Sequence, residues 1–202
     1  MKTRIVNLLP VLLLFAFYLM TPVVTQAQVP PPPPPPANDY FPQKWKEFLS
    51  VEGKFKIRFP GIPKESSTER ESNGIKLIVR SVNYKSFILY GVTYTDYPQN
   101  VDDPSIVKNF LDNVRNGGLS GIAETKPRII KESNISVNGH PSRFLQVEMD
   151  GKAILRAKYV AFKNRLYIVG VTTPKGHQNA LGAENDYEKI AMSFLDSFQI
   201  IE

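Results

Sequence analysis

The sequence predicts an α+β domain in which an antiparallel β-sheet packs against helices. Runs rich in β-branched and aromatic residues recur from residue 54 to the end of the chain. Short turns such as Asn138-Gly139 and Asp150-Gly151 separate several of these runs, and strands joined by such turns must pair antiparallel. Two further segments carry apolar residues at helical spacing. Strands and amphipathic helices together predict helices laid across one sheet.

The first 27 residues have the layout of a signal peptide. Lys2 and Arg4 form a positive start, a largely apolar run follows, and small residues precede a predicted cleavage site between Ala27 and Gln28. The alternative is an uncleaved membrane anchor, because residues 5–24 are about long enough to span a bilayer. We therefore expect an extracytoplasmic protein, periplasmic or secreted. If the signal is not cleaved, residues 5–24 would tether it to the membrane.

A proline-rich linker follows at residues 28–40, and a single domain occupies residues 41–202. Pro30 to Pro36 is an unbroken proline run, which adopts the extended polyproline II conformation and serves as a stiff spacer. A groove-binding ligand is the alternative role for such a run. The chain contains no cysteine, which excludes disulfides, cysteine-based metal sites and the lipid-modified cysteine of a lipoprotein anchor.

The first half of the domain contains three predicted strands and a helix. Residues 54–59 alternate strictly between polar and apolar, whereas residues 65–73 are polar and predict a loop. Residues 75–84 and 87–97 predict a hairpin whose faces do not sort cleanly, which indicates burial on both sides. Asp103 is the expected N-cap of a helix with an apolar stripe, and Gly117 is its expected end.

The second half contains four predicted strands, one helix and a short closing strand. The strands are expected at residues 127–137, 143–149, 153–162 and 165–173, the helix around residues 187–195, and the closing strand at residues 198–201. Trp45, Phe48 and Leu49 are expected to form a short entry segment that packs on the core ahead of the first strand.

Four short segments, in this order, resemble those of uncharacterised exported bacterial proteins of the PsbP-like class. They are Gly-Lys-Phe-Lys-Ile-Arg-Phe-Pro-Gly-Ile-Pro at 53–63, Tyr-Thr-Asp-Tyr-Pro at 94–98, Arg-Leu-Tyr-Ile-Val at 165–169 and Phe-Leu-Asp-Ser-Phe at 194–198. The resemblance covers residues 45–201 and implies an α/β/α sandwich shared with the Mog-type Ran-binding proteins. PsbP is an extrinsic lumenal subunit of photosystem II, so the resemblance also favours a non-enzymatic accessory role. No binding motif matches residue by residue.

The sequence offers no defined catalytic or metal-binding motif. His140 and His177 stand alone in predicted loops, and no Gly-x-Ser-x-Gly elbow is present. Asp96, Asp102 and Asp103 could gather around a cation, but helix capping explains the last two. We therefore expect no catalytic residues, no metal and no cofactor, with a hydrolase assembled from distant residues as the alternative.

Five residues are candidates for a contact surface. Tyr90 and Tyr94 share strand parity, so they lie on one face, as core residues or, if exposed, as a binding platform. Lys54, Lys56 and Arg58 form a cationic stripe, which would widen into a basic patch if the strand carrying Arg156 and Lys158 lay beside it.

The resulting hypothesis is a non-catalytic extracytoplasmic binding or accessory module. Its expected partner is a protein or a small ligand, and membrane contact is expected only if the signal stays uncleaved. The net charge of +6 without a dense Lys/Arg run argues against nucleic acid. An envelope-associated structural protein on a proline stalk is a further alternative.

Overall fold

The computed structural model describes residues 44–72, 74–175 and 184–201. The predicted signal peptide, its cleavage site at Ala27 and Gln28, the whole proline-rich linker and His177 lie outside these ranges. Neither of the α-helices in the described ranges, α1 (Val107–Gly121) and α2 (Glu184–Asp196), has the length and apolar character of a membrane span.

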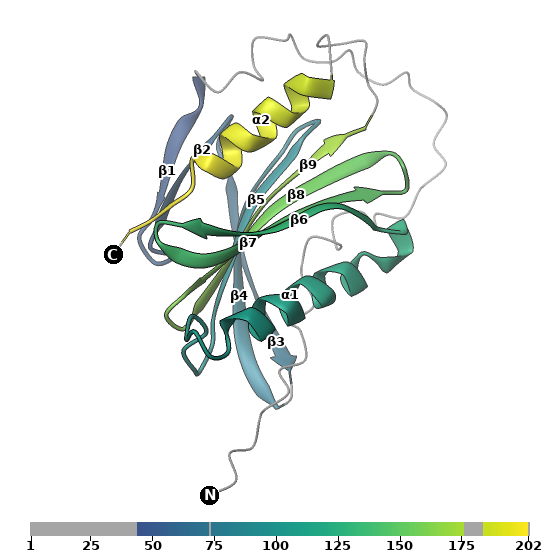
Figure 1. Ribbon diagram of the computed structural model, residues 1–202. Coiled ribbons are helices and arrows are strands. Elements are labelled where there is room, and N and C mark those ends of the chain that lie inside the picture. The colour runs from purple at the N-terminus through teal and green to yellow at the C-terminus, as the bar shows by residue number, and fades with distance from the viewer. Residues whose placement is uncertain (1–43, 73, 176–183, 202) are drawn as a thin grey trace, which may run out of the picture.

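A seven-stranded antiparallel sheet forms the centre of the domain (Figure 1). Its strands are β3 (Lys64–Ser72), β4 (Ile75–Lys85), β5 (Leu89–Asp96), β6 (Arg128–Val137), β7 (His140–Met149), β8 (Ala153–Phe162) and β9 (Arg165–Pro174). The strand order is β3-β4-β5-β9-β8-β7-β6, and every pair is antiparallel. The predicted antiparallel sheet is therefore confirmed.

Two layers cover the faces of this sheet. Helix α1 (Val107–Gly121) and the short 3-10 turn Ala123–Thr125 lie on one face. Helix α2 (Glu184–Asp196) and a small three-stranded sheet lie on the other, as Figure 1 shows. The strands of the small sheet are β1 (Lys46–Ser50), β2 (Phe55–Phe59) and β10 (Gln199–Ile200), in the order β1-β2-β10. The arrangement is an α+β sandwich with helices on both faces.

Strand alternation divides the interior into two apolar cores. In β9, Tyr167 and Val169 face α2 and the small sheet, whereas Leu166 and Ile168 face α1. Successive side chains of a strand point to opposite faces, and here both faces are covered. This explains why the predicted hairpin at residues 75–97 did not sort into a polar and an apolar face.

The polar segment at residues 65–73 was predicted as a loop, and that prediction was wrong. Residues Lys64–Ser72 form β3, whose backbone pairs with β4 from Lys64↔Asn83 to Ser72↔Ile75. β3 is an edge strand, and charged side chains on an edge oppose pairing with other chains. Both faces of β3 contact solvent, so its residues are polar on both faces. The alternation of polar and apolar residues by which a strand is recognised is therefore missing.

Helix α1 is displaced from its predicted position by about one turn. The Asp103 carboxylate accepts hydrogen bonds from the backbone N–H and hydroxyl of Ser105, so it shapes the turn before the helix and does not cap it. Gly117 was expected to end the helix, but it is buried inside it. A glycine inside a helix has a modest cost in helix propensity, and the helix continues through it to Gly121.

Candidate functional site

The turn between β1 and β2, residues 51–54, is fixed against the main sheet and forms the centre of the candidate site. The Tyr167 hydroxyl donates a hydrogen bond to the Gly53 carbonyl at 2.8 Å, and Arg165 Nη1 donates to the Glu52 carbonyl at 2.9 Å. The Lys54 carbonyl accepts from the Ile201 N–H at 2.8 Å. Three hydrogen bonds from distant segments thus hold one turn in place.

Local sequence explains the shape of this turn. A Cβ atom at Gly53 would lie 2.5 Å from Phe55 Cε1 and 2.6 Å from Ser50 Oγ, so a larger residue would require one of these flanking side chains or the turn itself to shift. The Gly53 N–H donates to Ser50 Oγ at 3.0 Å. Lys54 has a φ of 52°, a left-handed conformation that non-glycine residues seldom adopt.

Arg165 is the best-satisfied charged group beside the turn. Its Nε and Nη2 donate to the two carboxylate oxygens of Asp96 at 2.6 and 2.7 Å. This paired hydrogen bond raises the pKa of the Arg165 guanidinium above its ordinary value. Burial raises the pKa of the Tyr167 phenol, so its hydroxyl stays protonated and remains a donor to the turn.

Arg80 approaches the same turn from β4. Its Nε lies 2.7 Å from Glu52 Oε1, and its guanidinium lies 5.9 Å from the centre of the Tyr94 ring. The Arg165 guanidinium lies 5.0 Å from that ring centre. Burial raises the pKa of the Tyr94 phenol, and two cations near its ring add cation–π attraction.

Two hollows flank the turn, and we refer to them together as the turn crevice. The larger, about 280 Å³, is lined by Glu52, Glu65, Ser66, Ser67, Arg80, Ser81, Val82 and Tyr94. The smaller, about 80 Å³, is lined by Lys54, Asp96, Phe162, Lys163, Asn164, Arg165 and Tyr167. Charged groups and hydroxyls dominate both walls, so the crevice suits a small polar ligand held by hydrogen bonds and charge.

The structure places the candidate contact residues in different environments. Tyr90 and Tyr94 share a face but are 1% and 2% exposed, in the core, so they form no exposed platform. Lys54 lines the smaller hollow. Lys56 lies 3.7 Å from Glu47, and Arg58 is exposed.

The proposed widening of the cationic stripe does not occur. β2 belongs to the small sheet and β8 to the large one, so their cations do not form one surface. Arg156 is buried, and Lys158 Nζ donates to the Leu195 carbonyl and the Asp196 carboxylate at the end of α2. Matching faces cannot be inferred from composition when the strands join different sheets.

The sequence interpretation missed Arg80 and Arg165, which are two of the four cations that line the crevice. Arg165 begins β9 directly after the turn Lys163-Asn164. If the sequence had indicated that β5 and β9 are neighbours, the position of Arg165 opposite Asp96 could have been predicted. Arg80 shares strand parity with the core residue Val82, and a cation at such a position is the signal that could have identified it.

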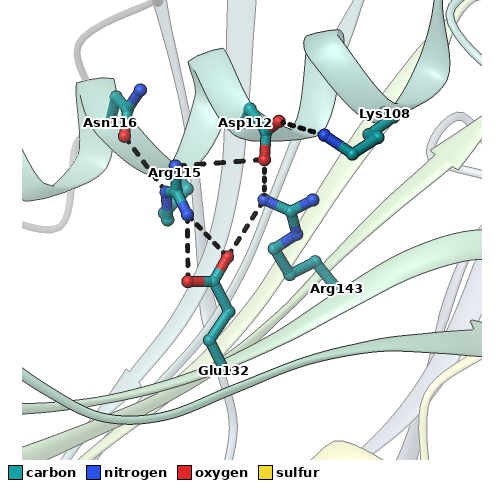
Figure 2. A network of polar contacts seen from close by, with 6 residues as sticks. All are labelled: Lys108, Asp112, Arg115, Asn116, Glu132 and Arg143. Carbon is teal, nitrogen blue, oxygen red and sulfur yellow. Dashed lines mark hydrogen bonds and ion pairs between the residues drawn. The ribbon is translucent and has the colours of Figure 1, made fainter.

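A second polar cluster joins α1 to the large sheet (Figure 2). Arg143 of β7 reaches toward the helix, where its Nη1 donates to the Asp112 carboxylate and, at 3.0 Å, to Glu132 Oε1. Arg115 Nη1 donates to both oxygens of Glu132 at 2.8 and 2.9 Å. Lys108 lies 3.3 Å from Asp112. These contacts join α1 to β6 and β7, and we call them the helix network.

Electrostatics follow from this geometry. The hydrogen bond from Arg143 holds the pKa of the Asp112 carboxyl below its usual range, despite partial burial. Arg143 is 4% exposed, whereas Asp112 and Glu132 are about a quarter exposed. One buried cation between two carboxylates links the helix to the sheet.

The acidic residues and the histidine considered for chemistry have separate partners. Asp96 binds Arg165, Asp102 accepts the Lys163 N–H at 2.7 Å, and Asp103 binds Ser105. Among the described residues, no three His, Asp or Glu side chains gather as a metal site would require. His140 was expected in a loop, but it begins β7, half-buried, with its ring 4.5 Å from that of Phe162.

The fold has a counterpart among solved structures. The chain matches the solution structure of cyanobacterial PsbP from Synechocystis with a TM-score of 0.50 and 10% identity, over 78% of this chain and 92% of that one. A Pseudomonas aeruginosa protein of unknown function matches with a TM-score of 0.36 and 12% identity, over 75% and 95%. A Bacteroides thetaiotaomicron structure matches at 0.41 and 10%, over 79% and 49%. No protein-family model and no curated protein matches the chain. The fold is therefore PsbP-like, as the sequence resemblance implied.

Proposed function

We propose that this protein is a non-catalytic binding or accessory module that works outside the cytoplasm and holds a small ligand or a segment of a partner protein in the turn crevice. The observation that carries the proposal is the fixed turn at residues 51–54 beside two polar hollows. A site held rigid before binding loses little conformational entropy when the ligand arrives.

The groups in the crevice suit binding more than bond-breaking. Arg165 is held by Asp96, and the Glu52 carboxylate lies against Arg80. The Ser81 and Thr93 hydroxyls bond each other at 3.1 Å. A nucleophile needs a base within hydrogen-bond reach to be activated, whereas these groups are placed to recognise charge and hydrogen-bonding pattern. The likeness in fold to PsbP supports an accessory role by analogy alone.

Site-specific photo-crosslinking in the living host tests the proposal. A photoreactive residue at Ser67, exposed on β3 and lining the larger hollow, should capture a defined ligand or partner. The matched control is the same residue at Ser136, exposed on the opposite edge strand β6. We expect a discrete product at Ser67 that is absent at Ser136. Equal labelling at both positions, or none at Ser67, would contradict a binding role for the crevice.

The extracytoplasmic location has its own test. N-terminal sequencing of the protein recovered from its host should give a chain that starts at Gln28. A chain that starts at Met1 or Lys2 would refute cleavage. Recovery of the protein in the cytoplasmic fraction would refute export.

A further inference from the structure

We propose that the smaller hollow of the turn crevice binds a single oxyanion, namely the phosphate, sulfate or carboxylate group of a ligand. The inference rests on the proposed binding function and names the chemical group that the site would recognise. Its basis is an excess of positive charge in a small, rigid space.

The charges around the hollow do not balance. Lys54, Lys163 and Arg165 line it, and Asp96 is the acidic residue in its wall. Both oxygens of Asp96 already accept hydrogen bonds from Arg165. In the described part of the chain, neither lysine ammonium has a carboxylate partner within ion-pair distance. Asp102 lies nearby, and its carboxylate accepts the backbone N–H of Lys163, which leaves its charge in place. With Asp102 included, the three cations exceed the two carboxylates by one, and neither lysine is held in an ion pair that an incoming anion would have to break.

Both lysines stand at the tips of fixed turns. Lys54 and Lys163 each have a φ of 52°, a conformation that costs free energy for residues with a side chain and gathers at functional sites. The Lys163 ammonium lies 4.9 Å from the centre of the Phe162 ring. The Lys163 carbonyl accepts the Val101 N–H at 2.6 Å, and the Asn164 carbonyl accepts the Tyr97 N–H at 2.7 Å. The second turn is thus held as firmly as the first.

The size of the hollow is compatible with a single charged group. A volume of about 80 Å³ exceeds the roughly 10 to 15 Å³ that one buried water needs on the same measure. That space accepts one oxyanion group with its hydrating water. The remainder of a larger ligand would extend outward from the turns.

Titration of the isotope-labelled intact protein with inorganic phosphate, followed by NMR at constant ionic strength, tests the inference. We expect saturable shifts of the Lys54, Lys163 and Asn164 amides with a Kd on the order of 1 mM, typical of a single charged group. Lys54→Gln and Lys163→Gln should each weaken binding about fivefold, because each removes one charge-assisted hydrogen bond.

Lys131→Gln is the matched control. Lys131 is an exposed lysine on β6 whose ammonium lies 5.9 Å from the Phe144 ring centre, so it repeats the contact of Lys163 with Phe162 without a hollow. Its affinity for phosphate should equal that of the wild type. Non-saturating shifts, shifts spread over all surface lysines, or affinities unchanged by Lys54→Gln and Lys163→Gln would overturn the inference.

Two further arms separate the possible sources of the anion. Glycerol phosphate serves as the soluble probe, and vesicles of phosphatidylglycerol, compared with phosphatidylcholine vesicles, present the same group on a membrane. Binding to either that depends on Lys163 supports the site and identifies the source. Crosslinking at Ser67 without saturable phosphate binding would refute the oxyanion site but not the binding function. Failure of both experiments would refute both proposals.

Discussion

Two arginines, Arg143 and Arg165, each hold a carboxylate partner, yet their surroundings assign them different roles. Arg143 lies beneath α1, and its contacts join the helix to β6 and β7. Arg165 lies beside an open hollow and ties the turn at residues 51–54 to β9. The same ion-pair chemistry therefore stabilises helix packing where α1 covers it and lines a candidate binding site where solvent reaches it.

Arg143→Met should produce the largest effect on stability. The substitution removes the buried cation of the helix network and leaves Asp112 and Glu132 with peripheral partners. Breaking a buried ion pair by removing one member costs about 3 kcal/mol. Urea denaturation should show this loss with an unchanged slope against urea concentration. A loss below about 1 kcal/mol would mean that the network contributes no more than a surface ion pair.

Tyr167→Phe should have the second-largest effect. It removes the hydroxyl that donates to the Gly53 carbonyl, and an unmade hydrogen bond at a buried group costs about 1 to 2 kcal/mol. Hydrogen exchange should become faster at the amides of residues 51–54. The amides of β7 should slow or quicken only as much as the change in global stability requires. Unchanged exchange at the turn would show that this bond does not hold it.

Acid should weaken the helix network through Asp112. Because Arg143 lowers the folded-state pKa of Asp112, the ion pair contributes stability above the unfolded-state pKa of about 3.9, and this contribution is lost as the pH falls through the lower folded value. Unfolding measured from pH 6 down to pH 2 should show a steeper loss in the wild type than in Asp112→Asn. Parallel curves would contradict the assignment.

Arg58→Gln should have the smallest effect. Arg58 is exposed on β2, and removing one exposed charge changes stability by less than about 0.5 kcal/mol. Its phosphate affinity, followed by the same NMR titration, should match the wild type. A large loss of stability or of phosphate affinity would indicate that the cationic stripe, rather than the turn crevice, is the functional surface.

Local patterns in the sequence predicted the features that depend on local spacing. The shared face of Tyr90 and Tyr94 follows from strand parity, and the apolar stripe of α2, including Ile190 and Phe194, is buried as its helical spacing predicted. The edge strand β3 escaped prediction because solvent contacts both its faces, which leaves its side chains without an alternating pattern.

The turn crevice could not be predicted because its contacts join distant parts of the chain. The bonds from Tyr167 and Arg165 to the turn span 114 and 113 residues. Only the order of strands in two separate sheets brings these groups together. The sequence contained Lys54 as a candidate contact residue, but nothing in its neighbourhood indicated that Lys163 would share its hollow.

The most direct test of the contrast between the two arginine centres is the phosphate affinity of Arg143→Met beside that of Lys163→Gln. Folded Arg143→Met should bind phosphate within about twofold of the wild type despite its lower stability, because the substituted residue lies on the other face of the sheet. Lys163→Gln should bind about fivefold more weakly with stability nearly unchanged. Equal losses of affinity in both variants would contradict the account, because the crevice would then reflect the general state of the fold rather than a site of its own.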